Sequence, residues 1–282
     1  MKKQLFVTTF CSLLLAGYGC SSPQAESQPQ DLTQYVDPYI GSGGHGHVFV
    51  GANVPYGLVQ LGPSSIPQEW DWTSGYHISD STVIGFPHMH LSGTGIGDLH
   101  DITLMPVVGE VTYARGVESD QNSGLWSYSD RSKEVVKPGY YATHLLRYDV
   151  DVELTATKRV GFHKYTFNQK ENAAVVFDLQ NGGCWDSPTK AYINKVDDKT
   201  IEGYRYSSGW ANDQREFFVA EFSEPITSLD VIVDRGEAVA DKGEGKIIYA
   251  RANVDAQKPV YVKVALSPTS IENAKLNMQT EL

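Results

Sequence analysis

Residues 150–156 read VDVELTA, and this stretch carries the pattern that decides the fold. Apolar Val150, Val152 and Leu154 alternate with acidic Asp151 and Glu153. Side chains point to opposite faces at every second residue of a β-strand, so such alternation predicts a strand with one buried and one solvated face.

The same two-residue period, or a short apolar run between turn residues, recurs along most of the chain. Further strands are predicted at residues 106–113, 161–167, 173–179, 200–206, 216–222, 228–233, 246–252 and 259–266. No helical pattern lies between them, so the sequence predicts an all-β fold of stacked antiparallel sheets. We expect this domain to span residues 32–268.

One helix is predicted, at the end of the chain over residues 269–282. Thr269 and Glu272 have the spacing of a capping box. An apolar stripe follows at intervals of three and four residues, through Ile271, Ala274, Met278 and Leu282. Nothing in the sequence obviously covers this stripe. We therefore expect the start of a helical region that belongs to a longer protein.

The first 31 residues have the layout of an export signal and a tether. Lys2 and Lys3 precede an apolar stretch that is shorter than a membrane span, and residues 1–19 end in small residues before Cys20. This order resembles a bacterial lipoprotein signal, with Cys20 as the lipidated N-terminus and residues 20–31 as a flexible tether. The alternative is an ordinary cleaved secretory signal. Either reading places the protein outside the cytoplasm, and the first places it in the periplasm or on the outer-membrane surface, held by a lipid anchor only.

The net charge limits the class of ligand, and the cysteine content limits the possible disulfides. The chain carries a formal net charge of −11, which disfavours nucleic acid and anionic lipid and indicates a neutral or cationic ligand. Beyond the signal only Cys184 remains, so no internal disulfide is expected. Cys184 is either a reactive thiol or, more commonly for a lone cysteine, a small buried apolar residue.

The segment from Ile40 to Met105 looks like a binding site. It holds six of the eight histidines and the glycine-rich runs IGSGGHGH and SGTGIGD. Glycine permits sharp turns and close approach of a ligand. These runs therefore predict loops that surround a bound ligand. Neither run fits a nucleotide site, because no helix follows the first and the second lacks the lysine of a phosphate-binding loop.

Several side chains in this segment have both a functional and a structural interpretation. Trp70 and Trp72 flank Asp71, where an indole can stack on a sugar ring and a carboxylate can accept hydroxyl hydrogens. If they lie on one strand, the two tryptophans instead face the same side as core packing. Trp126 lies in a Ser- and Asp-rich turn region, and Trp126→Ala is expected to leave enzymatic turnover nearly unchanged.

The histidines and remaining acids also leave alternatives open. His45 and His47, and likewise His88 and His90, stand two apart and could form half a zinc site, bond sugar hydroxyls or brace the loops. Asp98 and Asp101 are a catalytic carboxylate pair or, as turn aspartates usually are, loop supports.

Long blocks of the chain resemble the N-terminal domain of glycoside hydrolase family 92. They are GGHGHVFVGANVPYGLVQLGP from Gly43, WDWTSGYHISDSTVIGFPHMHLSGTGIGDLHDITLMP from Trp70, KPGYYATHLLRYDVDVELTATKRVGFHKYTF from Lys137, and GWANDQREFFVAEFSEPI from Gly209. The resemblance implies a calcium-dependent, exo-acting, inverting α-mannosidase. It also implies a β-supersandwich that packs on an (α/α)6 barrel, with the active site between the two.

The resemblance further implies how the catalytic and binding residues are distributed between the two domains. The catalytic acid and base and most calcium ligands belong to the barrel, which this sequence lacks, so no catalytic or metal-binding residue is expected here. This chain would supply one wall of the pocket for mannose-containing glycans. The positions implied as substrate contacts are Gly44, His45, Trp70, Asp71, His90 and Asp98. The alternative is a stand-alone, non-catalytic carbohydrate-binding lipoprotein.

Overall fold

The structure is a computed structural model that describes residues 30–182 and 185–282. Residues 35–282 form one compact unit. The proposed signal at residues 1–19, the lipidation site Cys20 and the lone Cys184 lie outside the described residues. None of the described helices is both long enough and apolar enough to cross a membrane.

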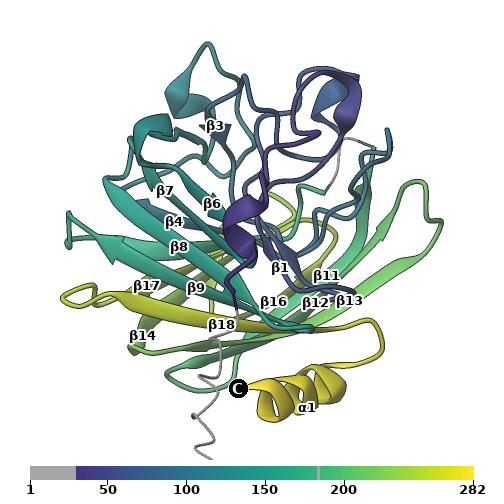
Figure 1. The fold of residues 1–282 in the computed structure, drawn as a ribbon. Coiled ribbons are helices and arrows are strands. Elements are labelled where there is room, and N and C mark those ends of the chain that lie inside the picture. The colour runs from purple at the N-terminus through teal and green to yellow at the C-terminus, as the bar shows by residue number, and fades with distance from the viewer. Residues whose placement is uncertain (1–29, 183–184) are drawn as a thin grey trace, which may run out of the picture. The chain divides into compact units, whose positions relative to one another are not determined.

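Two large antiparallel sheets make up the unit (Figure 1). The nine-stranded sheet has the order β16 (Lys242–Gly245), β11 (Ser187–Lys195), β12 (Thr200–Ser208), β13 (Gln214–Phe222), β18 (Val260–Ser267), β9 (Val160–Phe167), β8 (Val150–Ala156), β7 (Tyr140–Leu145) and β6 (Val135–Lys137). The five-stranded sheet has the order β15 (Ala238–Ala240), β14 (Ile226–Val233), β17 (Ile248–Val254), β10 (Ala173–Asp178) and β4 (Thr103–Val108).

Short elements complete the fold. Strand β1 (Ala52–Asn53) pairs with β2 (Gln60–Leu61), and β3 (Thr82–Val83) pairs with β5 (Ser127–Tyr128). Five 3-10 turns are η1 (Thr33–Tyr35), η2 (Gly44–Gly46), η3 (Trp70–Trp72), η4 (Gln121–Ser123) and η5 (Arg131–Lys133), and the one α-helix is α1 (Ile271–Glu281). The all-β prediction with a C-terminal helix is confirmed.

Each predicted strand exists, with small shifts at its ends. In β8 the side chains of Val150, Val152 and Leu154 are buried, whereas those of Asp151 and Glu153 are partly exposed, as the alternation predicts. The predicted strand at 106–113 is β4, which starts three residues earlier and ends before Gly109, whose φ of 75° turns the chain.

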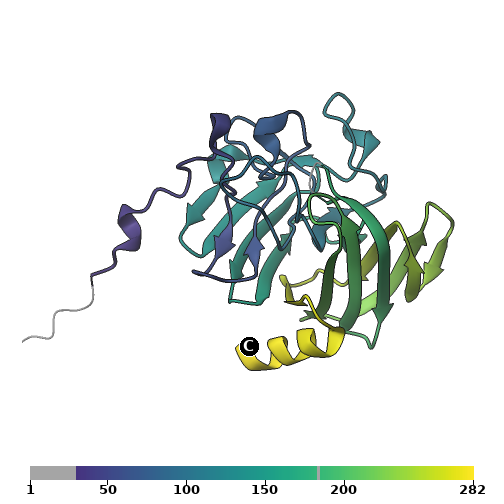
Figure 2. The same ribbon diagram turned by 90° about the vertical axis from the view of Figure 1, so that its right-hand side faces the viewer.

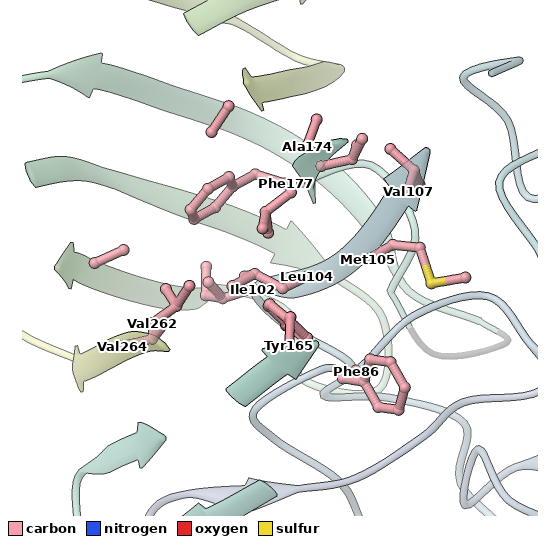
Figure 3. Close-up of a cluster of buried hydrophobic side chains, with 14 of the residues drawn as sticks. Phe86, Ile102, Leu104, Met105, Val107, Tyr165, Ala174, Phe177, Val262 and Val264 are labelled. Carbon is pink, nitrogen blue, oxygen red and sulfur yellow. The ribbon is translucent and has the colours of Figure 1, made fainter. Parts of the chain in front are cut away.

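The main core fills the space between the two sheets. Figure 3 draws this interior, with Leu104 and Phe177 from the five-stranded sheet near Tyr165, Val262 and Val264 from the nine-stranded sheet. These side chains are fully buried. Face-to-face packing of two sheets therefore supplies the apolar burial that stabilises the unit.

Helix α1 corrects one prediction. Its N-cap is Ser270, whose hydroxyl accepts the Asn273 N–H, and not Thr269. Met278 packs with Val160 and Ala265, and Ala274 is also buried. The helix lies against the outer side of the nine-stranded sheet near β18 (Figures 1 and 2). Ala274 and Met278 of the apolar stripe are thus covered by apolar side chains on the outer face of β9 and β18, whereas Leu282 stays exposed.

The Trp126 side chain is part of the interior, although the sequence around it has the composition of a turn region. Its side chain is fully buried in a small cluster with Ile66 and Ile84, and its ring meets Tyr128 edge to face at 5.0 Å. Loss of so large a buried side chain costs several kcal/mol, so Trp126→Ala should destabilise the fold.

Candidate functional site

The glycine- and histidine-rich segments form loops and short turns. They gather at the top of Figure 1, on the side away from α1. Trp70 and Trp72 lie in the 3-10 turn η3, so the alternative in which one strand presents them to the same side is wrong. Trp72 stacks on His77 at 4.3 Å and donates its indole N–H to Asp80 at 2.7 Å, whereas half of the Trp70 side chain stays exposed.

Two histidines and one aspartate surround Trp70. The Asp71 carboxylate lies 2.6 Å from Nδ1 of His45 and 3.3 Å from Nε2 of His47. The hydrogen bond from His45 is the largest cause that lowers the pKa of Asp71 below its usual value. The His47 ring meets Trp70 edge-on at 4.2 Å. A charged acceptor therefore stands beside an exposed aromatic face.

Glycines in two loops make this arrangement possible. Gly44 opens the turn that carries His45, with a φ of 53° in the left-handed region that favours glycine. The carbonyl oxygen of Gly95 accepts the indole N–H of Trp70 at 3.1 Å. A Cβ atom on Gly95 would overlap the indole ring, so only glycine allows the loop to hold Trp70 this closely.

A hollow of about 380 Å³ adjoins this group. Its lining residues are Pro67, Gln68, Glu69, Trp70, Thr73 and Trp185. Two half-exposed indoles supply apolar surface, and the amide, carboxylate and hydroxyl groups supply hydrogen-bond partners. Aromatic surface with a few polar groups is the composition that binds a neutral sugar ring.

Two of the six predicted contacts, His90 and Asp98, are buried and have protein partners. His90 is buried, stacks on Phe49 at 5.0 Å and bonds the carbonyl oxygen of Gln60 through Nδ1 at 2.7 Å. Asp98 is also buried and accepts the backbone N–H groups of Trp210 and Ala211. The structure thus brings together Gly44, His45, Trp70 and Asp71, while His90 and Asp98 support neighbouring loops.

Asp101 also lies in the interior, where it forms an ion pair. It is fully buried and accepts a hydrogen bond at 2.5 Å from Arg205, which also pairs with Asp186 at 2.8 Å. Burial raises the pKa of Asp101, and it raises that of nearby Glu216 well above the usual value. Asp98 and Asp101 therefore support loops rather than face the hollow as a catalytic pair.

The histidine pairs do not complete a metal site in the described part of the chain. His45 and His47 converge on Asp71, whereas His88 and His90 have different partners. Across residues 30–182 and 185–282, no three His, Cys, Asp or Glu side chains are grouped so that they could hold a metal ion. The half zinc site that the histidine pairs suggested therefore has no complete ligand set among the described residues.

Sequence reasoning missed two exposed tryptophans, of which one lines the hollow. Trp185 lines it, and its backbone N–H donates to the carbonyl oxygen of Gly97 at 3.1 Å. Trp210 is exposed at the turn between β12 and β13. Tryptophan in the polar, turn-rich contexts GCWDS and SGWAND is the signal that would have found them.

Comparisons with known proteins agree with this fold. Residues 35–267 match the model of the glycosyl hydrolase family 92 N-terminal domain. A family GH92 α-mannosidase from Bacteroides thetaiotaomicron, solved with mannoimidazole, is 34% identical with a TM-score of 0.84, over 89% of this chain and 34% of that chain. A family GH92 inverting mannosidase from Bacteroides thetaiotaomicron VPI-5482 shares the fold, with a TM-score of 0.72 and 20% identity over 89% of this chain and 33% of that one.

A curated relative is an uncharacterized secreted glycosidase of Arthroderma benhamiae. It is 29% identical over 163 residues, which are 55% of this chain and 20% of that protein. The chain thus spans about a third of the length of the solved relatives and a fifth of the curated one.

Proposed function

The chain belongs to glycosyl hydrolase family 92 through its residues 35–267, and on this premise we propose that it forms one wall of a mannose-binding active site. The observation that carries the proposal is the half-exposed indole of Trp70, held by Gly95 and flanked by the His45–Asp71 pair. A sugar ring stacks its C–H face on the indole, while the Asp71 carboxylate and the His45 imidazole bond its hydroxyls.

The choice of mannose as the bound sugar rests on the solved relatives. The solved relative at 34% identity is called an α-mannosidase and holds mannoimidazole, a mannose-like ligand. The hollow beside Trp70 offers the exposed side chains of Glu69 and Gln68 as further polar partners for the ring hydroxyls. These groups are neutral or acidic, which suits an uncharged sugar.

The hydrolytic step needs more than this wall. Inverting hydrolysis requires one carboxylic acid that protonates the leaving oxygen and one carboxylate that activates water. Asp71 is engaged by two histidines, and Asp98 and Asp101 face the interior. We therefore place the acid, the base and any calcium ion on a further helical domain, and we expect residues 30–282 alone to release no mannose from an α-mannoside.

Export and lipid attachment complete the proposal. The curated relative is described as secreted, and Cys20 follows an apolar segment and a glycine. Incorporation of labelled palmitate in a bacterial host should depend on Cys20 and disappear in Cys20→Ala. Labelling that persists in this variant would remove Cys20 as the anchor.

The test of the sugar site is calorimetric titration of residues 30–282 with methyl α-mannoside. Trp70→Ala should weaken binding by about 1–2 kcal/mol, or roughly five- to thirtyfold, because the stacking surface is lost. Tyr56→Ala is the matched control, since Tyr56 is a fully exposed aromatic residue in the turn between β1 and β2. Equal affinity of the Trp70 variant and the parent would refute the site.

A further inference from the structure

One glycine-rich loop, residues 93–98, anchors three exposed tryptophans. Gly95 accepts the indole N–H of Trp70, and Gly97 accepts the backbone N–H of Trp185, each at 3.1 Å. Asp98 accepts the backbone N–H of Trp210 at 2.6 Å. Segments that are distant in sequence are thus brought to one short loop.

The Trp210 turn is built to hold its indole outward. The buried Asp98 carboxylate accepts the N–H groups of both Trp210 and Ala211, at 2.6 and 3.3 Å. A Cβ atom on Gly209 would stand 2.5 Å from Oδ1 of Asp98, so glycine is required where the turn meets the carboxylate. The backbone of Trp210 is therefore fixed, while its ring makes no use of the interior.

The indole rings of Trp70, Trp185 and Trp210 are more exposed than those of the other two tryptophans. The exposed fractions are 52% for Trp70, 50% for Trp185 and 72% for Trp210, whereas Trp126 is fully buried and Trp72 stacks on His77. An exposed tryptophan side chain lacks the large stabilisation that its burial would give. Several exposed tryptophans anchored by one loop therefore mark a binding surface.

Trp185 and Trp210 are close neighbours through the loop. Their backbone N–H groups are bound by Gly97 and Asp98, which are consecutive and have Cα atoms about 3.8 Å apart. Trp185 also lines the hollow that contains Trp70. All three tryptophan segments are thus tied to, or lie against, one short loop beside the Trp70 hollow.

We propose that Trp185 and Trp210 form a second sugar-stacking subsite, which binds the next neutral sugar units of an α-mannose chain beyond the Trp70 hollow. This inference rests on the proposed function, because it extends the same surface. Sugar is favoured as the occupant because the hollow has polar groups among its aromatic ones, as a glycan needs and an apolar protein contact does not. The net charge of −11 disfavours an anionic polymer.

The experiment compares ligands of increasing length on residues 30–282, which contain the whole described core. Methyl α-mannoside, α-linked mannobioses and α-linked mannotrioses are titrated by calorimetry into the parent, Trp210→Ala and Tyr56→Ala. In the parent and in the Tyr56 control, affinity should rise at least fivefold from the monosaccharide to the best trisaccharide. Trp210→Ala should lose this gain and keep the monosaccharide affinity within twofold.

Asp98→Asn provides a second variant that keeps all three indoles. Because the weaker amide acceptor loosens the turn at residues 209–211, this variant should lose part of the chain-length gain at an unchanged monosaccharide affinity. Circular dichroism verifies that each variant is folded.

The possible failures are distinguishable. A parent that binds no monosaccharide refutes the proposed function itself. A parent that binds the monosaccharide but gains nothing with length, or a Trp210 variant that keeps the full gain, overturns only the second subsite. Self-association of the parent that Trp210→Ala abolishes, without any effect on glycan binding, would assign the surface to protein contact instead.

Discussion

The Nε2 atoms of His88 and His163 lie 2.9 Å apart in a part of the core that solvent does not reach. The carbonyl oxygen of Ile102 can only accept, so Nδ1 of His88, at 2.5 Å, carries the proton and Nε2 of His88 accepts. His163 then donates through Nε2 and accepts the Tyr165 hydroxyl at Nδ1, at 2.7 Å. In this order of donors both imidazoles are neutral, and burial lowers the pKa of both rings.

Acid should therefore destabilise the fold through His88. Burial lowers the pKa of His88 from 6.5 to about 4. The unfolded chain binds the proton first as pH falls, so stability from the neutral ring is complete above pH 6.5 and is lost between pH 6.5 and 4. From pH 7 to pH 5 the loss is about 2 kcal/mol, measurable by urea unfolding.

His88→Asn isolates this effect from other titrating groups. The variant should be less stable at pH 7, because it leaves His163 without its acceptor, but its stability should fall less steeply toward pH 5. Parallel pH dependences in the parent and the variant would contradict a neutral His88.

The buried ion pair between Arg205 and Asp101 should be essential to stability. Arg205→Met leaves the buried carboxylates of Asp101 and Asp186 without their cation, which costs about 3–5 kcal/mol and lowers Tm by roughly 10 °C. Arg215→Met is the control on the next strand, because its pair with Asp213 is exposed and contributes at most about 1 kcal/mol. Similar melting temperatures for the two variants would argue against a structural ion pair.

Helix α1 should depend on the face that packs on the sheet. Met278→Ala removes a buried side chain beside Val160 and Ala265, at a cost of about 2 kcal/mol. Leu276→Ala changes an exposed residue on the same helix and should alter stability by less than about 0.5 kcal/mol. Thermal melts of both variants compare them. A larger loss at Leu276 would mean that the other face of the helix is the buried one.

Gly95 should control sugar binding by positioning Trp70. Its backbone does not need glycine conformation, so Gly95→Ala introduces only a methyl group that displaces the indole. We expect roughly tenfold weaker binding of methyl α-mannoside, about 1.4 kcal/mol, with Tm nearly unchanged. Gly236→Ala is the control, because a Cβ atom there would meet only the Val233 carbonyl oxygen, at 3.1 Å. An unchanged affinity in Gly95→Ala would show that the contact with Gly95 does not position the ring.

The sequence predicted the strands better than the site because the two follow different rules. Alternation such as that of β8 reports one buried face directly. Strand β11 was not predicted from the sequence. Its register shifts between Pro188 and Lys190, which interrupts the alternation of apolar and polar residues. The helix was predicted, but its partner was not, since the apolar outer face of β9 and β18 is visible only in three dimensions.

The site could be predicted in part. His45, Trp70 and Asp71 lie near one another because glycine-rich turns fold two adjacent segments together. The contributions of Trp185 and Trp210 depend on the long-range contacts of Gly97 and Asp98, for which no local pattern exists. For the same reason the inward orientation of His90 and Asp98 could not be predicted from composition.

The five indole N–H groups provide the most direct measurement of the central claim. Residues 30–282 with ¹⁵N-labelled tryptophan are titrated with methyl α-mannoside, and signals are assigned by single Trp→Phe variants. We predict that the Trp70 and Trp185 resonances shift with saturation, while that of buried Trp126, bonded to Asp120, stays fixed. Saturable binding that leaves both Trp70 and Trp185 unmoved would show that the sugar site lies elsewhere.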